Sequence, residues 1–309
     1  MSSASTMPAW TSLTPEDIVR EVKNLPSAPK VLPRLKQLLG DGNSSMLEVV
    51  ALIRVDPGIA ARVLQVGNSA YFSSGVRCFT VEEAVNRVGY DQIYELVSMA
   101  VASQVLVRPL TAYGIEADDL WKLSVSCALA AEALASRTGM ERDVAYTAGL
   151  LHCLGMVAVD EWALHTDRPL QLRNTGYPEE ASAHERSVFG FTQGEVGCAL
   201  LKQWNFPNSM AEPLRWQYSP LRSVAFTKMS CLLHAAKWLR AVVCGGANPR
   251  PPLPAAALLE PLQFKPEALQ TLLPEVENRM AAISTMIDGG GPATLPPFPV
   301  GGASHWSAA

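Results

Sequence analysis

Helix-start signatures recur along the whole chain, and no segment alternates apolar and polar residues as a strand would. In a capping box, a Ser or Thr side chain and an acidic side chain three residues later satisfy free amide groups at a helix start. Such pairs occur at four places: Thr14 with Asp17, Ser45 with Glu48, Thr80 with Glu83, and Thr192 with Glu195. Apolar residues follow these starts at helical spacing. The sequence therefore predicts an all-α protein without a sheet of three or more strands.

The expected helices cover most of the chain. We expect a long apolar helix from Asp91 to about Val107, a loop from there to Glu116, and one continuous helix from Glu141 to about Val159. The segment from Gly245 to Pro254 is rich in Gly and Pro, which is typical of a linker, and two closing helices follow it. From Gly289 onward the composition predicts a disordered or extended tail.

Composition and charge exclude several classes of protein. The chain has 309 residues, 48% of them hydrophobic, and a net charge of −4 without a Lys/Arg-rich run, which argues against nucleic-acid binding. No apolar stretch reaches the ~18 residues of a transmembrane helix, and the N-terminus lacks a signal-peptide pattern. The six cysteines form no CxxC pair and lie in or near apolar helical stretches, which indicates buried, reduced thiols. We therefore expect a cytoplasmic protein that binds neither nucleic acid nor membrane.

One histidine lies inside an otherwise apolar run. The run Ala148–Val157 reads AGLLHCLGMV, in which His152 is followed directly by Cys153. A buried imidazole needs a hydrogen-bond partner, because an unsatisfied buried polar group costs about 1–3 kcal/mol. Two interpretations stay open for His152: a core histidine bonded to a backbone carbonyl, and the remnant of a pocket for an anion or small molecule. We interpret Cys153 as a buried thiol rather than a nucleophile.

Six segments in a fixed order resemble one protein family. They read LPSAPKVLPRLKQLL, ALIRVDPGIAARVLQVGNSAYF, FTVEEAVNRVG, DLWKLSVSCALAAEALA, AYTAGLLHCLGMV and HERSVFGFTQGEVGCALLKQWNFP. In this order they closely resemble the HDOD family, a degenerate, output-type relative of the HD-domain metal phosphohydrolases of bacterial signalling. The resemblance covers about Val19 to Leu239. It implies a mostly helical fold in which an N-terminal helical bundle packs on an HD-like helical bundle.

On this basis we divide the chain into five parts. They are an N-terminal tail at 1–15, an N-terminal helical lobe at 16–115, a degenerate HD-like lobe at 116–244, a linker with closing helices at 245–288, and a Gly/Pro-rich tail at 289–309.

The resemblance also assigns positions to the metal site of the HD superfamily. Its four ligand positions fall on Ser124, His152, Cys153 and Lys237, of which His152 alone keeps its side chain. Auxiliary histidine positions fall on His184, which is retained, and on Gln193, Gln217 and Tyr218, which are not. Cys153 and Lys237 replace two carboxylates, whereas a catalytic dication needs carboxylate charge. We therefore expect no catalytic residue, no bound metal and no cofactor. A zinc site from His152, Cys153 and His184 is a weaker alternative.

Two further motifs belong to the resemblance and are interpreted as structural. Asp56 and Pro57 form the pattern of a helix N-cap followed by proline at the first helical position. Asn68 and Ser69 are residue types that commonly bond the local backbone at a turn.

Three functions are considered from the sequence. The HDOD family is generally regarded as regulatory, so the first hypothesis is a non-enzymatic bacterial signal-transduction protein that acts through contacts with a partner protein. Whether it forms a homo-oligomer is left open. The alternatives are a metal-dependent phosphohydrolase with weak or altered activity, and a sensor that binds a small ligand in the vestigial pocket. The loss of most metal-ligand side chains favours the first hypothesis.

Overall fold

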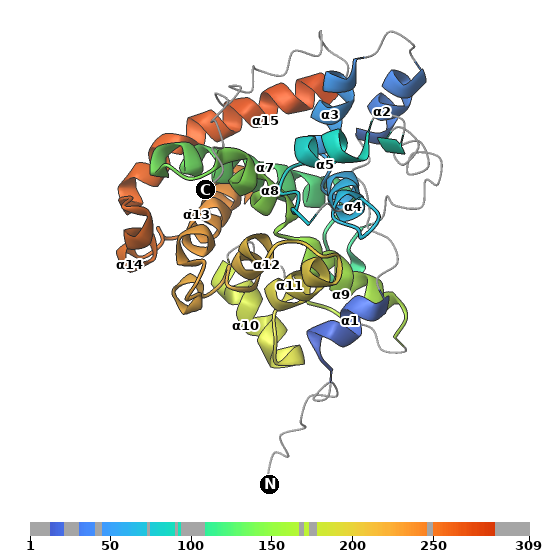
Figure 1. The fold of residues 1–309 in the computed structure, drawn as a ribbon. Helices are drawn as coiled ribbons and strands as arrows, with labels where there is room; N and C mark the ends of the chain where they lie inside the picture. The colour runs from blue at the N-terminus through green and yellow to red at the C-terminus, as the bar shows by residue number, and fades with distance from the viewer. Residues whose placement is uncertain are drawn as a thin grey trace.

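The chain folds into two packed groups of helices (Figure 1). The computed structural model describes residues 13–21, 31–40, 45–72, 75–89, 92–93, 109–166, 170–172, 178–245 and 250–287. Its α-helices are α1 (Pro15–Glu21), α2 (Val31–Gly40), α3 (Met46–Arg54), α4 (Pro57–Gly67), α5 (Val81–Val88), α7 (Ala117–Thr138), α8 (Arg142–Leu151), α9 (Leu154–Leu164), α10 (Pro178–Phe189), α11 (Gln193–Gln203), α12 (Asn208–Arg215), α13 (Thr227–Gly245), α14 (Ala256–Leu259) and α15 (Leu273–Ile287). Short 3-10 helices are η1 (Thr111–Tyr113), η2 (Pro220–Arg222), η3 (Glu260–Leu262) and η4 (Pro266–Leu272).

The prediction of an all-α fold is confirmed. Among the described residues, pairing of the β type is limited to an isolated antiparallel bridge between Leu110 and Ile115. None of the described helices combines the length and the apolar character that crossing a lipid bilayer requires.

The expected capping boxes form at the starts of α3 and α5. The Glu48 amide donates to Ser45 Oγ at 3.3 Å, and the Ser45 amide donates to the Glu48 carboxylate at 2.9 Å. Thr80 and Glu83 pair in the same way. These contacts join residues three positions apart, which is why their spacing in the sequence identifies the helix starts.

The HD-like lobe is built around the long helix α7, which packs against α8 and α13. Gly149 lets α8 approach α7, because a Cβ at this position would lie 2.7 Å from the carbonyl oxygen of Cys127. Gly155 on α9 does the same for α11, since a Cβ there would overlap the carbonyl group of Gln193. These close backbone approaches hold α8, α9 and α11 around one site.

The first lobe contains α2 to α5, and both ends of the described chain pack on the HD-like lobe. Helix α1 contacts α9 and α11, although we assigned its residues to the N-terminal lobe (Figure 1). Helix α15 runs along α7 and α13 at the other end of the molecule (Figure 1).

The end of α3 joins the two lobes through its backbone carbonyl groups. Tyr146 Oη on α8 donates to the carbonyl oxygen of Arg54 at 3.1 Å, and Trp121 Nε1 on α7 donates to that of Val55 at 2.8 Å. The last carbonyl groups of a helix have no partner within the helix. Two aromatic side chains of the HD-like lobe therefore supply donors to two carbonyl groups at the end of α3.

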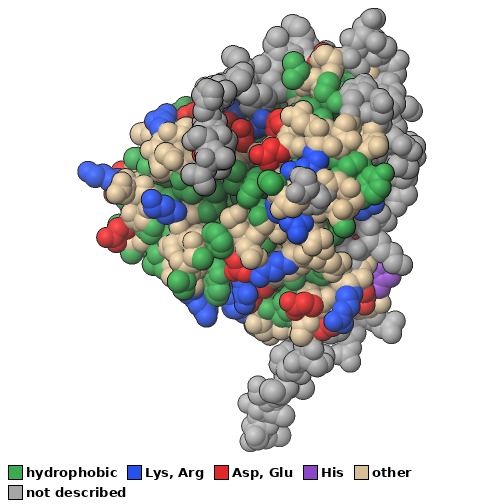
Figure 2. All heavy atoms as spheres, viewed as in Figure 1, with side chains coloured by type: hydrophobic (Ala, Val, Ile, Leu, Met, Phe, Trp, Pro, Cys, Tyr) green, Lys and Arg blue, Asp and Glu red, His purple; other side chains and the backbone are tan. Residues whose placement is uncertain are grey.

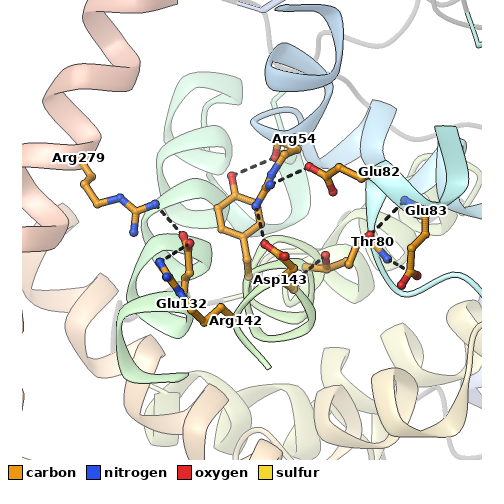
Figure 3. Close-up of polar contacts among 10 residues, drawn as sticks. Arg54, Thr80, Glu82, Glu83, Glu132, Arg142, Asp143 and Arg279 are labelled. Carbon is orange, nitrogen blue, oxygen red and sulfur yellow. Dashed lines mark hydrogen bonds and ion pairs between the residues drawn. The ribbon is translucent and has the colours of Figure 1, made fainter. Parts of the chain in front are cut away.

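Arg54 adds ion pairs to this joint. Its guanidinium lies between Glu82 on α5 and Asp143 on α8, at 2.7 and 3.3 Å (Figure 3). It also lies over the ring of Tyr146, 4.8 Å from the centroid. Because Arg54 is 7% exposed, water screens its ion pairs less than those of a surface pair.

A second set of ion pairs holds α15 on the HD-like lobe. Glu132 on α7 is 2% exposed and lies between Arg279 of α15 and Arg142 of α8 (Figure 3). The nitrogen–oxygen distances are 2.6 Å to Arg279 and 3.2 Å to Arg142. A buried carboxylate is thereby compensated by two guanidinium groups from different elements.

Two expectations from the sequence are corrected. The helix expected from Glu141 to Val159 is two helices, α8 and α9. Cys244 is exposed because it lies in the last turn of α13, whereas the other five cysteines are buried. Apart from residues 92–93, the helix expected from Asp91 to Val107 lies outside the described residues, as does the segment from Gly289 onward.

Candidate functional site

His152 and Cys153 form the break between α8 and α9. Helix α8 ends at Leu151 and α9 begins at Leu154. Nδ1 of His152 bonds the carbonyl oxygen of Gly149 at 2.6 Å. In a continuous helix that carbonyl would accept from the backbone amide four residues later. The imidazole therefore competes with the backbone for this acceptor, which gives a physical reason for the break in an otherwise helical apolar run.

The second ring nitrogen of His152 faces a cation from α13. Nη1 of Arg240 lies 2.8 Å from His152 Nε2, and Sγ of Cys153 lies 3.0 Å from the same nitrogen. Because Nδ1 donates to a carbonyl group and a guanidinium only donates, Nε2 is the acceptor. Burial lowers the pKa of His152 well below its ordinary value, and the charges of Arg240 and Lys237 lower it further. The ring is therefore neutral.

Lys237 lies one helical turn before Arg240 and is 1% exposed. Its Nζ donates to Oε1 of Gln217 at 2.7 Å and lies 3.4 Å from the centroid of the Tyr218 ring. Nε2 of Gln217 donates to the carbonyl oxygen of His152 at 3.2 Å. Burial lowers the pKa of Lys237 well below its ordinary value, and the charge of Arg240 adds to this effect.

The hydrogen-bond network continues from Tyr218 to a buried carboxyl group. The side-chain Nε2 of Gln193 donates to Tyr218 Oη at 2.9 Å, and the backbone amide of Gln193 donates to Glu185 Oε2 at 2.8 Å. Oη of Tyr113 donates to Glu185 Oε1 at 2.9 Å. Burial is the largest influence on Glu185 and raises its pKa to about 7, although its hydrogen bonds and Lys237 act in the opposite direction.

A small cavity lies beside Cys153, between the two lobes. Its volume is about 10 Å³, and its walls include Ser124 of α7, Cys153, and Pro57 and Gly58 at the start of α4. A space of this volume holds about one water molecule. The first lobe therefore covers the positions of Ser124 and Cys153, and the cavity between them is too small for a nucleotide.

The structure brings most of the positions assigned from the HD resemblance together. One network of hydrogen bonds and ring contacts includes His152, Cys153, Gln193, Gln217, Tyr218 and Lys237. Ser124 is joined to it through the cavity that it shares with Cys153. His184 is half-buried on α10, and the neighbouring Glu185 provides the side chain that enters the network.

Sequence reasoning missed Arg240 and Glu185. Signals for both were present in the sequence. Arg240 follows Lys237 by three residues, so the two side chains lie on one face of a helix. Glu185 follows His184 directly, and of the two neighbouring side chains it is Glu185 that is buried.

The family-pattern residues make local contacts. Asp56 accepts from a backbone amide in the first turn of α4 at 2.9 Å, with Pro57 as the first residue of that helix. The side-chain amide of Asn68 bonds both the backbone amide and the carbonyl group of Cys78, at 2.7 and 3.0 Å. Ser69 follows in the turn after α4. These contacts stabilise the start of α4 and the loop that follows it.

The site does not fit the metal ion that the HD resemblance implies. Within the described part of the chain, no three His, Cys, Asp or Glu side chains are grouped so that they could hold a metal. The acceptor nitrogen of His152 faces the guanidinium of Arg240, which stays charged and would repel a dication at this position. Lys237, which the resemblance assigns to the position of a carboxylate, supplies no negative charge.

Comparison with known families identifies the class of the chain. The sequence of residues 25–220 matches the family model of the HDOD domain. The chain therefore belongs to the HDOD domain family. An uncharacterized protein of Treponema pallidum (strain Nichols) is 27% identical over 227 residues, which cover 69% of this chain and 43% of that protein. The chain thus spans less than half the length of this relative.

Solved structures share the fold. The MmoQ response regulator of Methylococcus capsulatus str. Bath matches with a TM-score of 0.59 and 19% identity, over 81% of this chain and 98% of that one. A virulence factor of Campylobacter jejuni subsp. jejuni matches with a TM-score of 0.62 and 18% identity, over 86% of this chain and 99% of that one. At these identities, the likeness establishes the fold.

Proposed function

We propose that this chain is a non-enzymatic bacterial signalling protein that acts through contacts with a partner protein. The observation that supports the proposal most directly is the hydrogen bond of 2.8 Å between Arg240 Nη1 and His152 Nε2. In an HD-domain phosphohydrolase, the corresponding histidine binds a metal through a ring lone pair. In this chain both ring nitrogens are used within the protein, so His152 holds the helix break in place.

Two properties of neighbouring groups support the same proposal. Burial raises the pKa of the Cys153 thiol, and this effect exceeds the opposing charges of Arg240 and Lys237. A protonated thiol is a poor nucleophile. The adjacent cavity of about 10 Å³ cannot admit a phosphodiester.

The signalling role rests on the family and on one protein of the same fold. The HDOD family is regarded as regulatory, and the MmoQ protein is described as a response regulator. We extend this role to the present chain as part of the proposal.

The test combines two measurements on the full chain. Purified protein is incubated with Mn²⁺ or Fe²⁺ and a panel of nucleotides and phosphodiesters, and we expect the same background rate for the wild type and for His152→Ala. In parallel, the tagged chain is cross-linked in its source cell, and bound proteins are quantified against a tagged unrelated helical protein. A specific partner without hydrolysis supports the proposal. Metal-dependent hydrolysis that His152→Ala abolishes contradicts it.

A sensor of a small polar ligand is the second candidate function. Nε of Arg240 and Oε1 of Gln193 are buried and have no hydrogen-bond partner among the described residues, and such atoms call for a specific explanation. The test is the thermal midpoint of the full chain with added phosphate or small carboxylates. An increase in the wild type that is lost in Arg240→Met favours this candidate, because a ligand that binds only the folded state stabilises it.

A further inference from the structure

Positive charge is concentrated in one segment of this acidic chain. No aspartate or glutamate lies between Glu212 and Glu260, whereas six lysines and arginines do, although the whole chain has a net charge of −4. Four of the six are exposed, and three of these lie on α12, on α13 or in the connection between them: Arg215, Arg222 and Lys228. None of these three forms an ion pair with a described residue. Such unpaired charges are available to an acidic partner.

Large apolar side chains are exposed beside these charges, in the connection between α12 and α13. Val224 is 98% exposed and Leu221 is 51% exposed. In the same connection Trp216 contacts two guanidinium groups, those of Arg215 and Arg222, at 5.1 and 5.2 Å from its ring centroid. Trp and Arg are the residue types that contribute most often to binding energy in protein interfaces.

A mainly apolar groove follows directly along the chain. Its volume is about 440 Å³, and it lies where α8, α12 and α13 begin. Its apolar walls come from Met140, Val144, Ala225, Phe226 and Met229. The polar residues that line it are Ser209, Thr227 and Lys228, and none of the lining residues is acidic. Methionine side chains adapt to the shape of an apolar guest.

Val224 directly precedes the groove residues Ala225 to Met229, and Leu221 and Arg222 lie in the same connection. We name the groove together with Arg215, Leu221, Arg222 and Val224 the α12–α13 face. In the view of Figure 2, hydrophobic side chains reach the surface beside Lys and Arg side chains over the part of the molecule where α12 and α13 lie in Figure 1. An exposed apolar surface bordered by charge is typical of an interaction site.

We propose that the α12–α13 face is the docking surface for an acidic amphipathic helix of a partner protein. The inference rests on the proposed function and names the surface and the partner chemistry that it requires. Apolar side chains at positions i, i+3, i+4 and i+7 of the partner helix lie in the groove and against Val224. Acidic side chains on the flanks of that helix pair with Arg222 and Lys228.

The sign of the charge selects this occupant over a basic or neutral helix. All three unpaired charges of the face are positive, and like charges across an interface are repulsive. An acidic helix gains apolar burial and charge pairing at once, whereas a basic helix of the same shape loses the second contribution.

Site-specific cross-linking of the full chain in its source cell tests the proposal. A photoreactive benzophenone amino acid replaces Val224 in one variant and Leu47, which is 80% exposed on α3, in a matched control. We expect position 224 to cross-link to a second protein, and peptide mapping to place the link in a segment with acidic and apolar residues at helical spacing. No product from position 224, equal products from position 47, a link to a basic segment, or a link to a second copy of the chain would overturn the proposal.

Charge reversal is the second measurement, and it separates this inference from the proposed function. Arg222→Glu combined with Lys228→Glu is compared with Lys265→Glu, which changes an exposed lysine at the start of η4. We expect about tenfold weaker partner binding for the double variant, equivalent to about 1.4 kcal/mol, and no change for the control; circular dichroism verifies folding. Full binding by the double variant overturns the docking surface and leaves the signalling function standing. If the wild type binds no partner, the proposed function fails, and the docking surface fails with it.

Discussion

Arg240 donates a hydrogen bond from its guanidinium group to Nε2 of His152 across 2.8 Å. The two residues lie 88 positions apart in the sequence, one on α13 and the other at the break between α8 and α9. The bond satisfies the second nitrogen of a ring that is 1% exposed. It also places a permanent positive charge where a metal-binding histidine would face a metal ion.

Replacing Arg240 by methionine should raise the pKa of His152. The charge of Arg240 is the second cause of the low pKa, after burial, and methionine fills similar space without a charge. NMR titration of the ring nitrogens measures this pKa, and Lys228→Met, an exposed change on the same helix, should leave it unaltered. An unchanged His152 pKa in Arg240→Met would show that the two side chains do not interact in solution.

Purified wild-type protein should contain no stoichiometric transition metal at the HD positions. The acceptor nitrogen of His152 is used by Arg240, and Lys237 replaces a carboxylate. Elemental analysis for Fe, Mn and Zn is the measurement. About one metal per chain, lost in His152→Ala, would contradict this expectation.

Restoring both carboxylates should create weak metal affinity, and removing Arg240 as well should increase it. Cys153→Asp with Lys237→Asp returns two negative charges to the site, and Arg240→Ala frees Nε2 of His152. Isothermal titration with Mn²⁺ should therefore show tighter binding for the triple variant than for the double variant. Equal binding by the two variants would mean that the guanidinium does not block the ring nitrogen.

Glu185 should reduce stability as the pH rises. Burial raises its pKa from 4.5 to about 7, so between these values the folded protein keeps a proton that the unfolded chain has released. Because the folded state binds more protons there, this contribution to the free energy of unfolding decreases from about pH 4.5 to about pH 7 and is constant above. A shift of this size corresponds to about 3 kcal/mol.

Glu185→Gln should remove this contribution, because the amide is neutral at every pH. Urea unfolding between about pH 4.5 and 8 should show the variant gaining stability relative to the wild type as the pH rises, with a plateau above about 7. Comparison with the wild type cancels the opposite trend of His152 and His234, whose pKa values are lowered mainly by burial. If the stability difference between Glu185→Gln and the wild type does not vary with pH, the pKa of Glu185 is not raised in the folded protein.

Tyr146→Phe should lower the free energy of unfolding by about 1–3 kcal/mol. The change removes the hydroxyl that donates to the Arg54 carbonyl group and leaves a buried acceptor without this donor. Tyr71→Phe is the matched control, because Tyr71 is 85% exposed and should tolerate the loss of its hydroxyl. Urea denaturation of both variants measures the difference, and equal stabilities would show that the lobes do not depend on this bond.

The helical architecture could be predicted because its signals are local. The hydrogen bonds between Ser45 and Glu48 join residues three positions apart. The spacing of apolar residues likewise identifies the buried face of a helix from residues close together in the sequence. The family resemblance then indicated how the helices pack. The break at His152 could not be predicted in this way, because the apolar run continues through it without interruption.

The candidate site was predictable in part. The resemblance assigned His152, Gln217 and Lys237 to one site, and the structure places them in one hydrogen-bond network. Arg240 and Glu185 were missed because their roles depend on how far each helix is rotated about its axis. A rotation of one residue, about 100°, decides whether a side chain faces the core or the solvent.

The sequence by itself determined the all-α class, the helix starts at the capping residues and the resemblance to the HDOD family. That resemblance assigned Cys153 and Lys237 to carboxylate positions of the HD metal site. The tertiary structure decided which groups meet at the assigned positions: Arg240 reaches His152 from 88 positions away, and Pro57 and Gly58 of the other lobe line the cavity beside Ser124 and Cys153. It also decided which charges are buried and which remain available on the α12–α13 face. These outcomes depend on close packing between elements distant in the sequence, and no local spacing encodes that packing.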